Sequence, residues 1–542
     1  ADDAPAPADD AFAPPATGTD EAEDDSPAVE LGTLAEEDEA ASGEPSPALR
    51  IEGFRFQGNQ SIATAELESL VAPFVGQPLT FERVQEAAAA VTAEYRRRGR
   101  LLARAYVPAQ EVEGGVVLLA VTEGRLGAIV VEGNEYVSDA FVRDRLERAV
   151  REDGSLDTEA LEDALLVLRE DYEGIDARTV LEPGDEPGTV DLHAKVEEEF
   201  PLSITAFFNN YGSRFVSRHR FGLRVDASHL LVSGDRLSAT ALVGQRVNDL
   251  YGASGSYELP LNAYDTKLGV AGSYGTFEVA RDFQLLDIEG RSSSGTVYLR
   301  QLVTRTRDFA LSGELAFTYA DSRFFLGRRT SSHDVNSYLT LRAQGELVHW
   351  GGRTDALVEV AHGLDRLLGG MPRNDPKASR LGADNLFVKF SGFLSRVQPL
   401  GDQFSLYLRL GGQWATTNLV AGQEWQVGGA NTVRGYTPGE LAGDDGYFGS
   451  AELRFAPFER RELLQLLIFA DHGGKHRKDP LPGERRTAEL TGAGFGLRSH
   501  LSDPWWGALE LDLSLDVAWP LSPPANGHSE KPTYYVSATL EF

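Results

Sequence analysis

The sequence predicts two small α/β domains followed by a sixteen-stranded antiparallel β-barrel that crosses a membrane. Three observations lead to this fold class. Apolar and polar side chains alternate in segment after segment from about residue 200 to the end, the connections between these segments are alternately short and long, and residues 50–198 contain a repeated order of strands and helices. Alternation has the period of a strand that presents one apolar and one polar face.

The composition limits the classes of protein and of site. The chain has 542 residues and no cysteine, which excludes disulfides, thiolate metal sites and thiol catalysis. It contains no apolar run of about 18 residues and therefore no predicted transmembrane helix. A transmembrane barrel remains compatible with this composition, because only every second residue of its strands faces lipid.

Charge is concentrated at the beginning of the chain. The formal net charge is −32, and residues 1–48 hold fifteen Asp and Glu but no Lys or Arg. Such a segment buries too little apolar surface to offset its ordering entropy, so we expect a disordered acidic tail. The acidic balance of the rest of the chain argues against nucleic acid as a partner.

Residues 49–124 and 125–199 are predicted to form two α/β domains of the same order, β-α-α-β-β. Gly58-Asn59 after the first strand corresponds to Gly133-Asn134, 75 positions later. An apolar helical series recurs 77 positions later: Val84, Ala88, Val91 and Tyr95 become Leu161, Leu165, Leu168 and Tyr172. An internal duplication explains the paired spacings better than two unrelated α/β modules do.

Residues 200–542 are predicted to form the barrel. In the clearest strand, Leu509 to Trp519, apolar residues alternate with Glu510, Asp512 and Asp516, and three carboxylates on one face fit a water-filled lumen better than a protein core. The sixteen predicted strands are 202–210, 219–229, 235–246, 251–259, 264–277, 293–303, 308–320, 335–350, 352–363, 385–397, 402–414, 446–457, 463–471, 488–499, 506–519 and 533–542.

The connections have two lengths. Those after even strands are short, as in residues 348–352, 399–402 and 502–506, whereas residues 278–292, 364–384, 415–445 and 472–487 form long connections after odd strands. Short periplasmic turns and long outer loops are typical of outer-membrane barrels. Trp350, Trp505, Trp506 and Trp519 fall at strand ends, where an aromatic girdle is expected. A large soluble β-sandwich or propeller, the alternative, requires no such asymmetry.

Several short motifs accompany this pattern. Val433-Arg434-Gly435-Tyr436 lies in the sixth outer loop, Phe469-x-Asp471-x-Gly473 ends the thirteenth predicted strand, and the last strand ends on Phe542. The first α/β domain contains Tyr106-Val107-Pro108-Ala109-Gln110. Over residues 50–542 the chain resembles the two-partner secretion (type Vb) outer-membrane transporters, of the haemolysin/haemagglutinin secretion and activation type. The duplicated domains resemble POTRA (polypeptide-transport-associated) domains.

The resemblance implies a role for each motif. The sixth loop would fold back into the barrel, where Arg434 at its tip pairs with Asp471 on the wall. Tyr106, Pro108 and Gln110 would bind the client. The terminal residues Tyr534, Val536, Leu540 and Phe542 would form the signal read by the barrel-assembly machinery. Members of this family often begin with a plug helix; residues 28–41 are the only candidate here, and their acidity leaves a free tail equally plausible.

Few residues suggest catalysis or a metal. Ser292-Ser293-Ser294 lacks a nucleophile-elbow context, and Gly492-x-Gly494-x-Gly496 is a glycine-rich strand rather than a phosphate loop because no helix follows. His472 and His476 flank a predicted loop beside Asp471, and we expect mobile histidines there rather than a metal site. We therefore expect no enzymatic activity, cofactor or metal.

The expected function is translocation of an unfolded exoprotein, a large β-helical adhesin or haemolysin, across the bacterial outer membrane. The POTRA domains would capture the client in the periplasm, and an exposed sheet edge can accept an extended segment as an added strand. The absence of a nucleotide motif implies a driving force from client folding outside the cell. The alternatives are an outer-membrane protein insertion factor of the same superfamily and a passive diffusion porin, which has no use for two POTRA domains.

Overall fold

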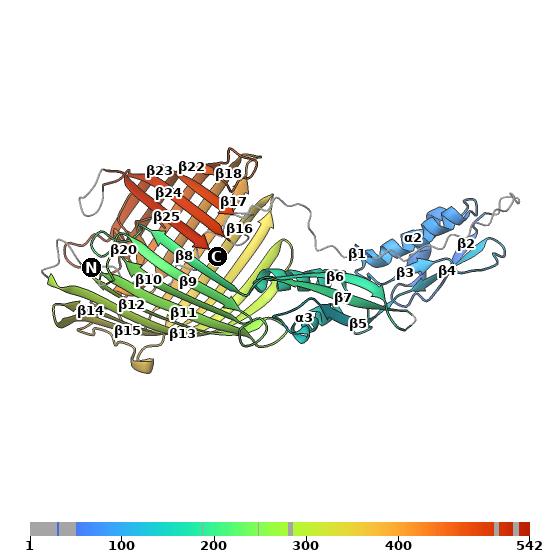
Figure 1. The fold of residues 1–542 in the computed structure, drawn as a ribbon, viewed down its shortest axis with the longest axis horizontal. Coiled ribbons are helices and arrows are strands. Elements are labelled where there is room, and N and C mark those ends of the chain that lie inside the picture. The colour runs from blue at the N-terminus through green and yellow to red at the C-terminus, as the bar shows by residue number, and fades with distance from the viewer. Residues whose placement is uncertain are drawn as a thin grey trace. The chain divides into compact units, whose positions relative to one another are not determined.

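The computed structural model describes residues 30–31, 50–186, 188–247, 249–279, 286–502, 509–523 and 531–542. These residues divide into two compact units, with the boundary between Pro201 and Leu202 (Figure 1). The N-terminal unit contains two α/β domains, and the C-terminal unit is a closed antiparallel barrel of sixteen strands. The predicted fold class is confirmed. Among the described residues, no helix is long and apolar enough to span a membrane.

The first α/β domain packs two helices against a three-stranded sheet of order β2-β4-β3. Its elements are β2 (Gly53–Gln57), α1 (Thr64–Val71), α2 (Phe81–Arg97), β3 (Arg104–Tyr106) and β4 (Val116–Thr122). Helix α2 begins where the Thr80 side chain accepts a hydrogen bond from the Arg83 N–H. The predicted series Val84, Ala88, Val91 and Tyr95 is the buried face of α2.

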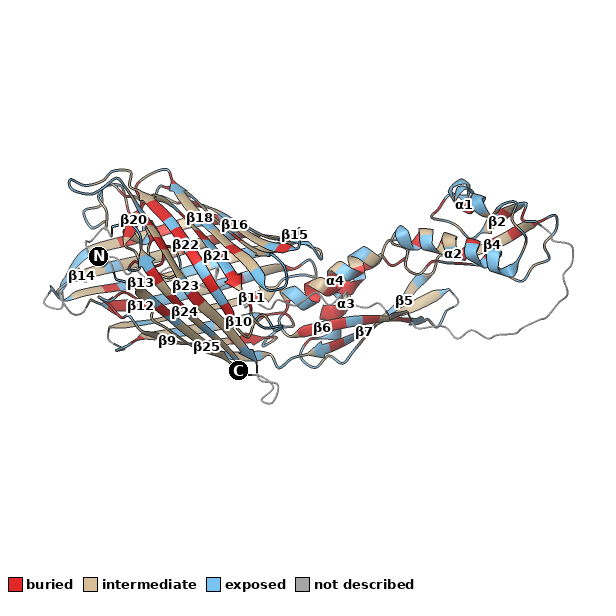
Figure 2. Ribbon diagram, turned by 90° about the horizontal axis from the view of Figure 1, so that it is seen from above, coloured by how far each residue is buried: buried red, intermediate tan, exposed pale blue. Residues whose placement is uncertain are grey.

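The second α/β domain repeats this arrangement. Its elements are β5 (Arg125–Glu132), α3 (Asp139–Leu146), α4 (Thr158–Asp171), β6 (Ile175–Pro183) and β7 (Thr189–Glu198). The corresponding residues of the second series, Leu161, Leu165, Leu168 and Tyr172, are also buried. Asp157 caps α4 by accepting hydrogen bonds from the Glu159 and Ala160 N–H groups. The two series therefore perform the same packing task in both domains (Figure 2).

One part of the acidic tail lies in a sheet. Glu30–Leu31 forms β1, which pairs in parallel with Val180 and Leu181 of β6 and extends the second sheet to the order β1-β6-β7-β5. Strand β6 is otherwise an edge whose backbone groups are open to an added strand. Between the plug helix and the free tail that the sequence left open for residues 28–41, these two residues do not favour a helix, because they pair as a strand. The remainder of residues 1–48 lies outside the described residues.

The barrel strands follow one another around the wall, and β25 closes the barrel against β8. The sixteen strands are β8 (Leu202–Asn209), β9 (Arg220–Ser228), β10 (Arg236–Gly244), β11 (Leu250–Pro260), β12 (Thr266–Glu278), β13 (Ile288–Arg305), β14 (Phe309–Leu326), β15 (Arg329–His349), β16 (Gly352–Gly363), β17 (Val388–Pro399), β18 (Phe404–Ala415), β21 (Asp445–Phe455), β22 (Gln465–His476), β23 (Thr487–Ser502), β24 (Glu510–Pro520) and β25 (Thr533–Glu541).

Several strands are longer than predicted. The stretch 321–334 was expected to connect two strands, but β14 and β15 continue through it and meet in a tight turn at residues 327–328. The stretch lacks apolar alternation because its strands are held by polar pairs across the ladder, including His333 Nε2 to Asp321 Oδ2 at 2.8 Å. The connections after β12 and β22 are correspondingly shorter than expected.

The predicted difference in length holds for several other connections but not around the whole barrel, because residues 245–249 after β10 form as short a connection as residues 261–265 after β11. Short turns follow β15 and β17, whereas loop 5 (residues 364–387) and loop 6 (residues 416–444) are long. Of the expected aromatic girdle, Trp350 is 85% exposed and Trp519 is 38% exposed at strand ends. Trp505 and Trp506, with most of the predicted turn at 502–506, lie outside the described residues.

Candidate functional site: the loop-6 tip inside the barrel

Loop 6 is a packed element rather than a solvated connection. It contains a two-stranded hairpin formed by β19 (Trp425–Val427) and β20 (Leu441–Gly443), with the Val433 to Tyr436 motif between them. Apolar side chains of the loop pack on those of strands β21 and β23; the cluster is Trp425, Val427, Val433, Tyr436, Leu441, Phe448 and Leu490. This burial of apolar surface holds the loop against the barrel wall in addition to the contacts of its charged residues.

The tip of loop 6 places a buried arginine on the wall. Arg434 Nε lies 2.7 Å from Asp471 Oδ2, and Arg434 Nη2 lies 2.8 Å from Asp471 Oδ1. The backbone N–H of Arg434 donates a third hydrogen bond to Asp471 Oδ2 at 3.1 Å. Both residues are 1% exposed. The structure thus brings the two residues of the expected pair into bidentate contact, a geometry that a guanidinium can adopt and an ammonium cannot.

Two further carboxylates surround the guanidinium. Arg434 Nη1 lies 2.8 Å from Glu452 Oε1 and 3.2 Å from Asp516 Oδ2. These acids are themselves paired, Glu452 with Arg454 at 2.8 Å and Asp516 with Arg498 at 2.7 Å. Burial lowers the pKa of the Arg434 guanidinium, but the hydrogen bonds and charge of Asp471 more than reverse this effect and hold that pKa above its usual value. We call Arg434, Asp471, Glu452 and Asp516 the inner lock.

The wall motif Phe469-x-Asp471-x-Gly473 occupies three successive inward positions of β22. The Phe469 ring lies against the guanidinium, with Arg434 Cζ 3.4 Å from the ring centroid. At Gly473 an added Cβ would lie 3.0 Å from the side chains of Val427 and Val433 of the loop. The motif therefore supplies an aromatic ring and a carboxylate for the guanidinium, and at Gly473 the room that the valine side chains of the loop require. It lies in the middle of β22 rather than at its end, because the strand continues to His476.

Glycines of β23 allow the loop tip to approach the wall. A Cβ at Gly492 would lie 2.0 Å from the Arg434 carbonyl oxygen, and one at Gly494 would lie 2.6 Å from the Phe469 ring. Neither position can carry a side chain without displacing the tip or the ring beneath it. The repeated Gly-x-Gly spacing in a strand was a signal for this contact that sequence reasoning used only to exclude a phosphate loop.

The last strand also holds the tip, through a residue that sequence reasoning missed. The Tyr535 hydroxyl accepts a hydrogen bond from the Gly435 N–H at 3.0 Å and donates one to the Tyr436 carbonyl oxygen at 2.9 Å. Tyr535 is 3% exposed. The sequence feature that could have identified Tyr535 is the presence of a bulky aromatic residue on the otherwise polar face of the terminal strand. Gly435 adopts φ +101°, a left-handed conformation that favours glycine.

The predicted terminal residues lie on the outward face of β25. Tyr534, Val536 and Phe542 are exposed, as the apolar face of a membrane barrel requires, and Leu540 is half-buried. Phe542 pairs its backbone with Ile204 of β8, N–H to oxygen at 3.0 Å. The end of the chain therefore completes the ladder that closes the barrel.

Of the predicted client-binding residues of the first α/β domain, one is exposed to solvent and another is hydrogen-bonded within the domain. Tyr106 is 45% exposed on the edge strand β3. Gln110 is engaged within the domain: its amide donates to the Leu118 carbonyl oxygen at 2.8 Å and accepts from the Leu118 N–H at 2.7 Å. The Gln110 side chain thus continues the ladder on β4 beyond Tyr106, where Pro108 has no N–H to offer.

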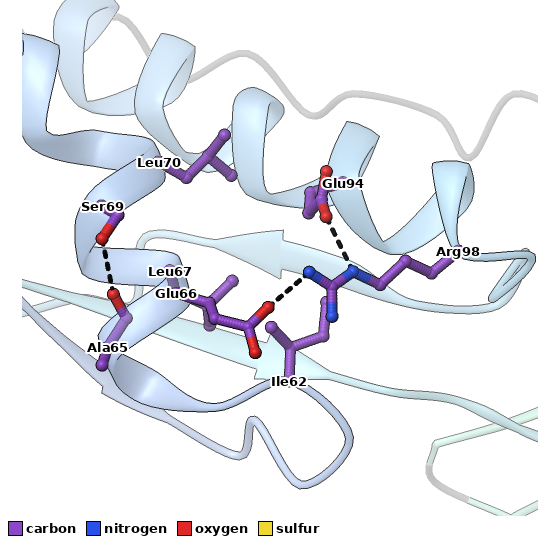
Figure 3. Close-up of a pocket in the computed structure, with 8 residues that line it drawn as sticks. All are labelled: Ile62, Ala65, Glu66, Leu67, Ser69, Leu70, Glu94 and Arg98. Atoms are coloured by element: carbon purple, nitrogen blue, oxygen red, sulfur yellow. Dashed lines mark hydrogen bonds and ion pairs between the residues drawn. The ribbon is translucent and has the colours of Figure 1, made fainter.

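The same domain has an open pocket of about 470 Å³ between α1 and α2. Figure 3 shows Arg98 reaching across it, paired with Glu94 of its own helix and with Glu66 of α1. Three hydrogen bonds, two from Arg97 and one from Arg98, lower the pKa of Glu94 to about 2. These ion pairs connect the two helices at one end of the pocket.

The two histidines considered as metal ligands lie on β22 rather than in a loop. His472 is within hydrogen-bond distance of Thr491 Oγ1 at 2.9 Å, and His476 of Asp445 Oδ2 at 3.1 Å. Strand β22 is longer than predicted, which places both histidines in the ladder.

Comparisons with known proteins agree with this architecture. A family model described as haemolysin secretion/activation protein ShlB/FhaC/HecB matches residues 188–499, and one described as POTRA domain, ShlB-type, matches residues 49–124. The heme/hemopexin transporter protein HuxB of Haemophilus influenzae is 25% identical over 501 residues, covering 90% of this chain and 86% of HuxB.

Solved structures share the fold. The structure of CdiB from Escherichia coli superposes with a TM-score of 0.68 at 20% identity, covering 93% of this chain and 92% of CdiB. BamA from Haemophilus ducreyi lacking POTRA domains 1–3 gives a TM-score of 0.55 at 17% identity, covering 91% of this chain and 100% of that one. The resemblance to two-partner secretion transporters is confirmed, because the family match spans more than half of the chain. The chain belongs to the haemolysin secretion/activation protein family, ShlB/FhaC/HecB, of outer-membrane β-barrel transporters with POTRA domains.

Proposed function

We propose that this protein is the outer-membrane pore through which an unfolded exoprotein leaves the cell. The observation that supports this function most directly is the inner lock: the tip of loop 6 is fixed on the lumen wall by contacts from β21, β22, β24 and β25. A loop held inside the lumen by a polar cluster can be displaced and reseated, whereas a solvated outer loop offers no such control. Arg434 and Asp471 are the residues on which the seated position depends.

The two α/β domains, residues 49–124 and 125–199, would capture the client in the periplasm. The exposed side chain of Tyr106 supports a contact with the client, and the edge strand β3, on which Tyr106 lies, can accept an extended segment. Gln110 would act indirectly, by holding the segment after Tyr106 in place. Because transport in this scheme uses no nucleotide, the driving force would be the folding of the client outside the cell.

Two relatives bear on the client. HuxB is described as a transporter for heme/hemopexin, and CdiB as an outer-membrane transporter. By analogy we propose a large secreted β-helical protein of the adhesin or haemolysin class, with outer-membrane lipid around the barrel and the barrel-assembly machinery as a partner during biogenesis.

Gene deletion tests the function. We expect a neighbouring reading frame to encode a large exoprotein, which should disappear from the culture medium and reappear on complementation, while the levels of other outer-membrane proteins stay unchanged. A general loss of outer-membrane proteins would indicate an insertion factor instead. Unchanged export combined with reduced uptake of small solutes would indicate a diffusion porin.

Deletion of residues 50–198 tests the capture step. The barrel should still reach the outer membrane but should no longer bind the N-terminal region of the exoprotein. Unchanged binding in this deletion variant would exclude the two domains as the receptor.

A further inference from the structure

A second buried polar cluster holds loop 6 at its base, on the outer side of the barrel. It consists of Arg380 in loop 5, Glu424 and Asp444 in loop 6, and Arg477 in loop 7 (residues 477–486). We call these four residues the outer latch. Three loops that are far apart in the sequence meet in it, and its charges alternate between acid and base.

Asp444 is the most constrained member of the outer latch. It is completely buried and pairs with the Arg380 guanidinium. It also accepts hydrogen bonds from the Leu419 N–H at 2.7 Å and from the Lys478 N–H at 2.8 Å. Burial raises the pKa of Asp444, but the hydrogen bonds from Arg380 and from the two backbone N–H groups outweigh this effect. The net pKa is therefore below its usual value, and the carboxylate stays charged. One side chain thus fixes both ends of loop 6 and the start of loop 7.

Glu424 extends the cluster to loop 7. Its carboxylate lies 2.7 Å from Arg380 Nη1 and 2.9 Å from Arg477 Nη2. The Glu424 side chain is only 3% exposed, and the Arg380 and Arg477 side chains are 11% and 15% exposed. A buried pair of this kind is costly to break, because removal of one partner leaves an uncompensated charge.

Apolar packing supports the same junction. Met371 and Ala383 of loop 5 are buried against Val420 of loop 6. Between them, Ser379 Oγ accepts a hydrogen bond from the Ala421 N–H at 2.9 Å. Loop 5 is therefore bound along the first arm of loop 6, not only at the charged cluster.

The outer latch and the inner lock share no residue. The partners of Arg434 in the inner lock lie on β21, β22 and β24, whereas the partners of Glu424 and Asp444 lie on loops 5 and 7. The two clusters therefore restrain loop 6 through separate sets of charged partners.

We propose that the outer latch is a second, separate restraint on loop 6, which must open on the outer side of the barrel before the loop can leave the lumen. Arg380 and Asp444 are positioning residues in this device: they hold the base of the loop, while Arg434 holds its tip. This inference rests on the proposed function, because a loop that never moves needs no release. It adds that loops 5 and 7 must separate from loop 6 during each transport event.

A reversible crosslink tests the proposal. The chain has no cysteine, so the double variant Ser379→Cys/Ala421→Cys introduces one possible disulfide between loop 5 and loop 6. Its formation in the full-length protein is verified by mass spectrometry of the linked peptides. Oxidised protein should export the neighbouring exoprotein at least tenfold more slowly, and reductant should restore export. Each single cysteine variant serves as the control and should export equally well in both conditions.

The outcomes separate the inference from the function on which it rests. If the disulfide forms and the oxidised protein exports as fast as the protein treated with reductant, the outer latch is not a gate, although the protein remains a transporter. If the unmodified chain exports nothing, the proposed function itself fails.

A second measurement requires no client. In planar bilayers, Arg380→Ala should increase the frequency of transient conductance openings several-fold, because Asp444 and Glu424 lose their shared partner. The matched control is Arg373→Ala, which removes an exposed arginine from the same loop. Equal behaviour of the two variants would overturn the assignment of Arg380.

Discussion

Gly435 at the tip of loop 6 donates its backbone N–H to the hydroxyl of Tyr535, 100 residues later in the chain, at 3.0 Å. The same hydroxyl donates to the carbonyl oxygen of Tyr436 at 2.9 Å. A side chain on the terminal strand, next to the closure between β25 and β8, therefore fixes the main chain of the loop tip. Seating of loop 6 and completion of the barrel depend on the same strand.

Replacement of Tyr535 by Phe should loosen the loop tip without removing the ring. The Gly435 N–H and the Tyr436 carbonyl would lose a buried partner, which costs about 1–3 kcal/mol. Hydrogen exchange should become faster at residues 433–436 while the barrel ladder stays protected. Tyr534→Phe is the control, because Tyr534 is 51% exposed on the outward face of the same strand. Equal exchange in the two variants would show that the hydroxyl does not hold the tip.

Substitution of Gly492 by Ala should displace the loop tip by steric contact alone. The added Cβ would lie 2.0 Å from the Arg434 carbonyl oxygen, so the tip has to move away from β23. Export should fall severalfold, although no charge has changed. Gly295→Ala in β13 provides the control, because a Cβ there meets nothing within 4 Å. Normal export by Gly492→Ala would contradict the close approach of loop and wall.

In the first POTRA domain, Tyr106→Ala and Gln110→Ala should have different effects. Loss of Gln110 leaves the Leu118 N–H and carbonyl without their partner, so that domain should unfold more easily, by about 1–3 kcal/mol. Loss of the exposed Tyr106 ring should weaken client binding at unchanged stability. The first effect is measured by chemical denaturation of the full-length protein, with protease cleavage within the first POTRA domain as the readout of its unfolding. The second effect is measured by binding of the exoprotein's N-terminal region. A stability loss confined to Tyr106→Ala would reverse the two roles.

The arrangement of the two POTRA domains at their joint should not change between pH 5 and pH 8. Arg100 of the first domain pairs with Asp153 of the second at 2.9 Å, and Arg151 of the second domain donates a hydrogen bond to the Arg98 carbonyl oxygen of the first at 3.5 Å. Hydrogen bonds from Ser155 and Arg100 lower the pKa of Asp153 below its usual value of 3.8. The contribution of this carboxylate is therefore complete above that value and is lost only as the pH falls below it.

Spin labels on α2 and α4, introduced through two cysteines in the otherwise cysteine-free chain, measure this joint. The distance distribution should be the same at pH 5 and pH 8, and should broaden in Arg100→Ala. A distribution that changes between these two pH values would show that another titrating group controls the joint.

The sequence predicts the architecture well because each level of it has a local signature. Alternation locates all sixteen barrel strands, and the repeated helical series locates α2 and α4. Strand ends such as those around Asp321 and His333 are mispredicted because polar cross-strand pairs replace apolar alternation there. The Glu30–Leu31 strand has no local signature, because its pairing depends on the free edge of β6.

The site is predictable only where a short motif marks it. Arg434 and Asp471 stand in recognisable motifs, but Glu452, Asp516 and Tyr535 belong to strands whose polar faces look alike in sequence. Their role follows from register: Ser450 is opposite Asp471 in the β21–β22 ladder, which brings Glu452 alongside the guanidinium. The outer latch is hidden for the same reason, because Arg380, Glu424 and Asp444 become neighbours only when the loops pack.

The measurement that tests the central claim most directly is a double-mutant cycle on Arg434 and Asp471, with export of the neighbouring exoprotein as the readout. Removal of one partner of this buried pair costs about 3–5 kcal/mol, enough to displace the loop tip but not to open a closed barrel. Arg434→Ala should therefore reach the outer membrane, stay heat-modifiable on gels and export poorly. Asp471→Ala should be less severe, because Glu452 and Asp516 still bind the guanidinium, and Arg434→Lys should restore export only in part. The double variant should be little worse than Arg434→Ala alone, since both changes delete the same contact. Wild-type export by Arg434→Ala, or single losses that simply add, would contradict the claim that this pair seats the loop.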